Sequence, residues 1–336
     1  MIRPIPSQLF CALALLVVPT EVGLGAIITV SETVADFGTL NQRAMTNACD
    51  SNPLSSCGPT ATANSLLFLQ NTYPNVYDTR LVPNGAGQPQ ATVNTLGMFM
   101  DCGCAGESTA QMLQGKMAYI QGGPDATGTN RTGVAPNTTV FDSQFLSDFT
   151  GTGKGTVPTL AFMLQELRAK EDVEMVIGLY TLSGTTYTRT GGHVVTLTGV
   201  SYDDTNNAPR NVSFIDPLGT TTNLNGALTI NGANFTTVAT QYGNLLDISN
   251  YFASLNNPLW NPRTDANTFA LIDGLVAESP VPEPTAIVLF ALGIAVLCLT
   301  RVRTRNWSRL YRWSSGGIVH CDGNLARGKL IVCSRG

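Results

Sequence analysis

Two apolar segments, one near each end of the chain, limit the part that can build a folded core to the residues between them. Within residues 1–26, a positive charge is followed by an apolar run and small residues, the layout of a secretory signal peptide. Within residues 281–305, Val-Pro-Glu-Pro precedes an apolar run at 285–300, and three arginines follow. Positive charge beside an apolar run marks the cytoplasmic side of a membrane segment. We therefore expect an exported domain at 27–280, attached to a membrane through the C-terminal segment.

The order of Val-Pro-Glu-Pro, apolar run and arginine cluster resembles the PEP-CTERM sorting signal of Gram-negative bacteria. This resemblance implies that an exosortase-type enzyme cuts near the motif and passes the protein to the cell envelope or outer surface. The run is shorter than the roughly 20 residues of a comfortable transmembrane helix, which suits a sorting signal; an ordinary single-span anchor is the alternative. Residues 306–336 lie beyond the usual end of such signals, and we interpret them as read-through or a gene-boundary error, or else as a short cytoplasmic tail.

The charge of the expected domain excludes one class of partner. Residues 27–280 contain ten Lys and Arg against twenty Asp and Glu, a formal net charge of −10. A protein with this charge is repelled by phosphate backbones and by anionic lipid surfaces. We expect no nucleic-acid partner.

The distribution of local patterns predicts a single α+β domain. The first half has helical patterns and the second half has runs rich in β-branched residues that are separated by Gly, Asn and Asp turns. Helices followed by an antiparallel sheet are typical of the α+β class. A stretch dense in Gly, Thr and Asn, residues 121–139, is expected to be a long surface loop. The expected helices are Cys57–Gln70, Ala91–Met100, Thr109–Ile120 and Thr156–Lys170, and the expected strands are Glu174–Leu182, His193–Tyr202, Asn211–Ile215 and Thr268–Val276.

Cys57 stands at the expected start of a helix, in the run Ser-Ser-Cys-Gly-Pro-Thr-Ala. The unpaired N–H groups and the positive dipole end of a helix stabilise a thiolate, which is the reactive form of cysteine. The small residues Gly58 and Ala61 allow the helix to pack closely, so that its first residue can lie at the floor of a cleft. Cys57 is therefore a candidate nucleophile.

His193 is the only histidine within residues 27–280, so any mechanism that needs an imidazole base must use it. It follows two glycines and is expected to open a strand, where its ring can meet a sulfur atom and exchange protons. Asp216 ends the next expected strand, and its carboxylate can accept the second ring N–H if the two strands pair. With a single histidine and few cysteines, a histidine-rich metal site is excluded, and no cofactor or metal is expected.

The order Cys57, His193, Asp216, with Gly-Pro after the cysteine and Gly-His at the start of an apolar strand, resembles papain-like cysteine peptidases. The nearest relatives by this resemblance are the bacteriocin-processing, double-glycine peptidases. The spacing between the cysteine and the histidine also fits that class. The resemblance implies a papain-like fold in which Cys57 is the nucleophile, His193 the base and Asp216 its orienting partner.

One part of the family pattern is absent from its usual place. Such enzymes carry a glutamine a few residues before the cysteine, which donates to the oxyanion formed during acyl transfer. Here the nearest upstream glutamine is Gln42. Either Gln42 folds back into place, or Asn52 substitutes for it, or the oxyanion site is incomplete. We favour Gln42.

Each candidate also has a purely structural interpretation. Exported proteins form disulfides, so Cys57 could be bridged; the four cysteines of the domain allow two bridges, or one bridge from Cys49 to Cys102 or Cys104 with two free thiols. His193 could be a structural histidine, and an Asp before Pro is also common in plain turns.

We therefore expect an exported cysteine peptidase that cleaves a peptide or protein substrate. Two alternatives remain open at this point. One is a transglutaminase-like acyl transferase, since that class shares the Cys, His, Asp order. The other is a non-enzymatic surface or biofilm-matrix protein on an inactive scaffold.

Overall fold

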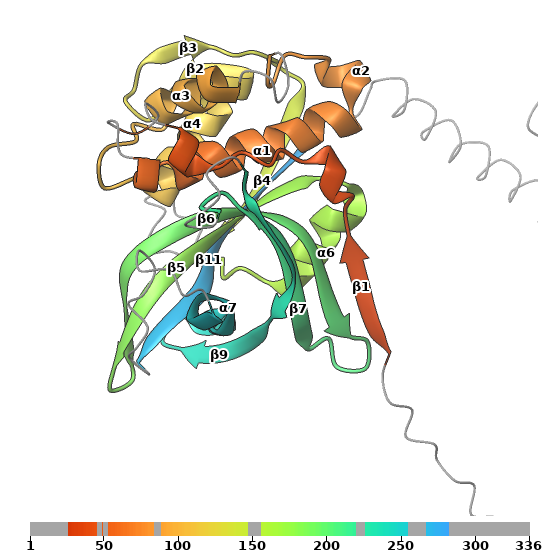
Figure 1. Ribbon diagram of the computed structural model, residues 1–336, viewed down its shortest axis with the longest axis vertical. Helices are drawn as coiled ribbons and strands as arrows, with labels where there is room; N and C mark the ends of the chain where they lie inside the picture. The colour runs from red at the N-terminus through yellow and green to blue at the C-terminus, as the bar shows by residue number, and fades with distance from the viewer. Residues whose placement is uncertain are drawn as a thin grey trace, which may run out of the picture. The chain divides into compact units, whose positions relative to one another are not determined.

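The computed structural model describes residues 26–45, 49, 53–83, 89–146, 156–219, 226–254 and 267–281, all of which belong to one compact unit (Figure 1). The expected signal peptide, sorting signal, apolar run at 285–300 and tail lie outside the described residues. No helix within the described ranges is both long and apolar enough to cross a membrane.

The fold is α+β, with helices first and a large antiparallel sheet after them, as the sequence predicts. The helices form a layer on one side of the sheet in Figure 1. Ser108 caps the last helix of this layer, α4 (Thr109–Gln121), through a reciprocal pair of hydrogen bonds with Gln111, the capping-box arrangement. The helices of this layer are α1 (Cys57–Thr72), α2 (Pro74–Tyr77), α3 (Pro89–Phe99) and α4 (Thr109–Gln121), preceded by the short 3₁₀ helices η1 (Val34–Asp36), η2 (Gln42–Ala44) and η3 (Pro53–Ser55).

The sheet has nine strands within the described residues, in the path β8-β7-β6-β5-β11-β10-β9, with β1 paired to β6 and β4 paired to β11. Its two end strands, β8 and β9, are joined by Phe235 alone, and the sheet is strongly curved in Figure 1. Two helices accompany it, α6 (Leu160–Ala169) beside β1, β5 and β6, and α7 (Ser249–Ser254) beside β8 and β11. The strands are β1 (Ile27–Ser31), β4 (Thr139–Phe145), β5 (Asp172–Ser183), β6 (Thr186–Asp203), β7 (Pro209–Asp216), β8 (Leu228–Asn234), β9 (Thr236–Thr240), β10 (Gly243–Asp247) and β11 (Thr268–Pro280).

Two element starts and one loop differ clearly from the sequence predictions, besides shorter shifts at other element ends. Strand β6 begins at Thr186, so His193 lies inside the strand and does not open it. The β-branched threonines before the glycine pair extend the ladder to β5, and Gly184, with φ of 62°, forms the turn that makes this possible. Helix α6 begins later than predicted, because Thr159 caps it from outside. The expected loop at 121–139 contains a small hairpin, β2 (Gly122–Pro124) with β3 (Asn130–Thr132).

Helix α1 is the element that joins the helical layer to the sheet. Its residues from Gly58 to Gln70 are all buried, and it packs against both β5 and β6. Thr196 of β6 donates a hydrogen bond from its hydroxyl to the backbone carbonyl of Ala61, at 3.0 Å. Small residues along this face allow the close approach, so the start of α1 lies next to the middle of β6.

A second connection between the layers is a buried charge cluster. The Lys116 ammonium of α4 lies 2.5 and 2.6 Å from the two oxygens of Glu174, 3.4 Å from Asp172, and in direct contact with Glu278, and all four side chains are fully buried. Ser65 of α1 donates to Asp172 at 2.5 Å. Burial raises the pKa of Glu174 to about 7, and burial together with the neighbouring carboxylates raises the pKa of Glu278. The three carboxylates of the cluster therefore depend on the Lys116 ammonium, the one cation among them, for their counter-charge.

We predict that Lys116→Met lowers the free energy of unfolding by about 3–5 kcal/mol, because it leaves three buried carboxylates without a counter-charge. Denaturant-induced unfolding at neutral pH measures this change. The exposed Lys170 at the end of α6 provides the control, since Lys170→Met should change stability by no more than about 0.5 kcal/mol. Equal effects of the two substitutions would show that the cluster does not hold the layers together.

Candidate active site

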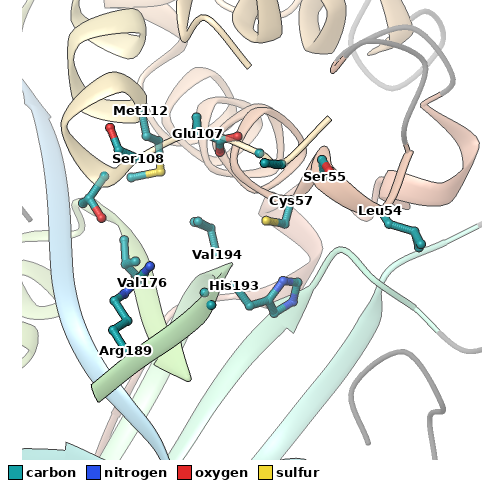
Figure 2. A pocket seen from close by; sticks show the side chains of 15 residues that line it. Leu54, Ser55, Cys57, Glu107, Ser108, Met112, Val176, Arg189, His193 and Val194 are labelled. Atoms are coloured by element: carbon teal, nitrogen blue, oxygen red, sulfur yellow. The ribbon is translucent and has the colours of Figure 1, made fainter. Parts of the chain in front are cut away.

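A cavity of about 180 Å³ lies where the start of α1, the segment before α4, and strands β5 and β6 meet (Figure 2). Its walls include the backbone of Gly191 and Gly192, which adds no side-chain bulk beside β6. Both Cys57 and His193 line it. The structure thus brings two of the predicted site residues, distant in sequence, into one hollow.

Cys57 is the first residue of α1, as predicted, and it is a partly buried free thiol. The first N–H groups of a helix have no carbonyl partner within the helix, so the sulfur lies at the end where negative charge is favoured. The short helix η3 directly before it supplies Leu54 and Ser55 to the cavity wall. The place of Cys57 at the start of α1 is therefore explained without a disulfide.

His193 lies between Cys57 and Asp216. Its side chain is fully buried, its Nε2 atom is 2.7 Å from Oδ1 of Asp216, and its ring also interacts electrostatically with the Cys57 side chain. Because Nε2 is engaged with the carboxylate, Nδ1 is the nitrogen left to exchange a proton with the sulfur. Burial alone would lower the pKa of His193, but the Asp216 charge and the hydrogen bonds raise it to about 10. The imidazole is therefore positively charged at neutral pH.

Asp216 ends β7, the strand paired with β6, so the predicted strand pairing is present. Besides His193, its carboxylate accepts from the backbone N–H of Leu218 and from the hydroxyl of Tyr251, each at 2.8 Å. Burial would raise the pKa of Asp216, but its interaction with His193 and these hydrogen bonds lower it. The carboxylate thus stays ionised and fixes the ring of His193.

Tyr251 is a site residue that the sequence analysis missed. It comes from α7, and its ring packs edge-on against Phe214, with centroids 4.9 Å apart and planes at 88°. No local motif marks the six-residue helix that carries it. Helix α7 packs beside β8, the strand paired with the end of β7, and so lies near the carboxylate. No short stretch of sequence predicts this contact.

Gln42 is brought near the site but does not line the described cavity. It is buried in η2, and its backbone N–H donates to the carbonyl of Pro217, next to Asp216, at 2.7 Å. Its side-chain amide donates to the carbonyl of Leu54, which does line the cavity, at 3.0 Å. Its role at the oxyanion stays a prediction.

The cysteine pairing follows one of the two arrangements that the sequence allows. Cys49 and Cys102 form a disulfide, and neither Cys57 nor Cys104 belongs to a disulfide. The bridge ties together the two segments that carry one wall of the cavity, before α1 and before α4. The described residues bring metal-ligand atoms together in two places. One includes the bridged cysteines, and the other is the carboxylate cluster that already holds the Lys116 ammonium, so neither presents an open coordination site.

No protein-family model and no curated protein matches the chain. The functional argument therefore rests on the geometry of the site.

We predict that replacing both bridged cysteines, Cys49→Ser with Cys102→Ser, lowers the free energy of unfolding by about 4 kcal/mol. The bridge spans a sequence separation of 53 residues, and a loop of that length loses this much denatured-state entropy when closed. Equilibrium unfolding in denaturant measures the loss. Cys104→Ser, at an exposed cysteine outside the disulfide, is the control and should change stability little. A double variant as stable as the control would mean that the bridge does not constrain this wall.

Proposed function

We propose that the domain is a papain-like cysteine peptidase in which Cys57 is the nucleophile, His193 the proton carrier and Asp216 the residue that orients His193. The observation that carries this proposal is the chain of contacts from the Cys57 side chain through the His193 ring to the Asp216 carboxylate, at the edge of a cavity. A structural histidine needs neither a free thiol on one side nor a cavity beside it.

The arrangement of elements also favours this fold. A buried helix carries the thiol at its first residue, and a curved antiparallel sheet carries the histidine and the carboxylate on neighbouring strands. In papain-like enzymes, a helix and a sheet likewise supply the two halves of the site.

The proposed reaction follows from the charges. His193 as imidazolium holds the proton that Cys57 has released, and the thiolate attacks the carbonyl carbon of a peptide bond. The bond from that carbon to nitrogen then breaks, and His193 gives its proton to the departing amine. Water, deprotonated by His193, releases the acyl group from sulfur and restores the thiol. Asp216 holds the ring in place throughout.

The cellular location and the partners of the protein are also proposals. The disulfide between Cys49 and Cys102 fits an oxidising compartment outside the cytoplasm. We propose that the C-terminal segment attaches the protein to a membrane until an exosortase-type enzyme sorts it to the envelope or surface. A peptide or protein is the proposed substrate.

We predict that iodoacetamide alkylates Cys57 rapidly at about pH 6, because the start of α1 and the charged ring of His193 favour the reactive thiolate. The full-length protein is labelled at graded pH, and mass spectrometry gives the rate for each cysteine. Cys104, an exposed thiol in the same molecule, is the internal reference, and we expect Cys57 to react at least about tenfold faster at pH 6.

The variant His193→Ala completes the test. It should slow alkylation of Cys57 at pH 6 by about tenfold or more and leave Cys104 unchanged. If Cys57 reacts no faster than Cys104, or if the loss of His193 has no effect, the peptidase proposal is wrong. An exported protein without enzymatic activity would then be the remaining interpretation.

A further inference from the structure

The cavity that holds Cys57 and His193 is also lined by an arginine, Arg189. In Figure 2, Cys57 and the ring of His193 lie toward the right of the view, whereas Arg189 and Ser108 lie toward the left. Arg189 belongs to β6, the strand that carries His193, so one element of the sheet positions both cations. The proposed reaction uses His193 and gives no role to Arg189.

Two glycines that face each other on neighbouring strands make room for the Arg189 side chain and its partner. Gly192 of β6 pairs with Gly178 of β5. A Cβ atom at position 192 would clash with the Arg189 guanidinium, and one at position 178 would clash with the carboxylate of Asp273. Asp273, from β11, accepts from Nε of Arg189 at 2.9 Å and from the hydroxyl of Tyr180 at 3.2 Å. The guanidinium is thus held against the backbone of the cavity wall.

The groups at this end of the cavity favour an anion. The Arg189 side chain is 27% exposed and lines the cavity, whereas Asp273, which pairs with it, is fully buried and is not part of the lining. The start of α4, from Ser108 onward, also lines the cavity, and the first turn of a helix attracts negative charge. Glu107, the one carboxylate in the described lining, lies directly against Gly58 at the start of α1.

We propose that Arg189 binds a carboxylate of the peptide substrate, so that the enzyme selects peptides with an acidic group close to the bond it cleaves. This inference rests on the proposed function. A guanidinium is planar and always charged, and its N–H groups match the two oxygens of a carboxylate. Arg189 takes no part in bond making or breaking; it determines specificity by holding the substrate with its carbonyl group at Cys57.

The carboxylate has two possible sources in a peptide, and they differ in position. On the acyl side of the cleaved bond it belongs to an acidic side chain. On the side of the leaving group it belongs either to an acidic side chain or to the C-terminus of the substrate. Probes that carry the charge on one side or the other therefore separate these sources.

The test uses two pairs of aryl esters with the full-length protein, and the members of each pair match in size but differ in charge. The mono-p-nitrophenyl ester of terephthalic acid and the p-nitrophenyl ester of terephthalic monoamide differ on the acyl side. The esters p-acetoxybenzoate and p-acetoxybenzamide differ on the leaving group. Attack by Cys57 forms the acyl thioester and releases the phenolate, and the Cys57→Ala protein gives the background to subtract.

We expect the carboxylate member of one pair to acylate Cys57 at least about tenfold faster than its amide partner, the usual effect of a hydrogen bond to a charged group. Arg189→Met should abolish this preference and change the rate with the amide member little, which reports that the site is intact. Arg131→Met is the matched control. Arg131 also pairs with a buried aspartate, Asp125, and is 33% exposed, but it does not line the described cavity, so the preference should persist.

Two further variants guard against a trivial loss of folding. Arg189→Met leaves the buried Asp273 without its cation, which destabilises proteins. The double variant Arg189→Met with Asp273→Asn removes both charges and should lose the preference in the same way. Arg189→Lys keeps the charge but loses the paired N–H groups, so it should keep only part of the preference.

The outcomes separate this inference from the proposed function. Equal rates within both pairs for the wild-type protein overturn the inference, as does a preference that survives Arg189→Met, because another group then binds the carboxylate. If both variants that lack Arg189 lose charged and neutral esters alike, the arginine only holds β6 to β11, and the inference is also wrong. The peptidase proposal stands in all three cases. If the wild-type protein is neither acylated nor alkylated at Cys57, the proposed function itself fails.

Discussion

The packing of α1 against β6 is the contact on which the whole site depends. It buries the helix from Gly58 to Gln70 and fixes the first residue of that helix beside the middle of a strand. Cys57 and His193 meet because these two elements meet, and Asp216 follows because β7 pairs with β6. The disulfide and the Lys116 cluster hold the segments around this contact, so the precision of the site comes from the core of the fold.

The fold buries several ionisable groups, and removing their charges from water costs folding free energy. The folded state binds a proton at Glu174 that an unfolded chain releases near pH 4.5, so this group favours folding less as the pH rises to about 7. His193 has the opposite charge and a pKa raised from 6.5 to about 10; its contribution to stability is complete below pH 6.5 and is lost as the pH rises through 10.

Local patterns were enough to predict the elements that carry the site. The helix that begins at Cys57 and the strand that holds His193 follow from Gly-Pro placement and β-branched runs, and the α+β order follows from their sequence. The start of β6 and the contact of Tyr251 with Asp216 were not predictable. Tyr251 reaches Asp216 from α7, a short helix that packs beside β8 and β11 and that no local motif marks. Such contacts depend on tertiary packing, which no short sequence pattern encodes.

The central claim is that the Asp216 charge keeps His193 protonated beside Cys57, and ¹⁵N NMR of histidine-labelled protein tests it most directly. The two ring nitrogens of His193 report its protonation state, and the His193→Ala protein assigns their signals. The account predicts an imidazolium at pH 8, which becomes neutral in Asp216→Asn because burial then acts without the opposing charge. A wild-type His193 that is already neutral at pH 8 would contradict the account.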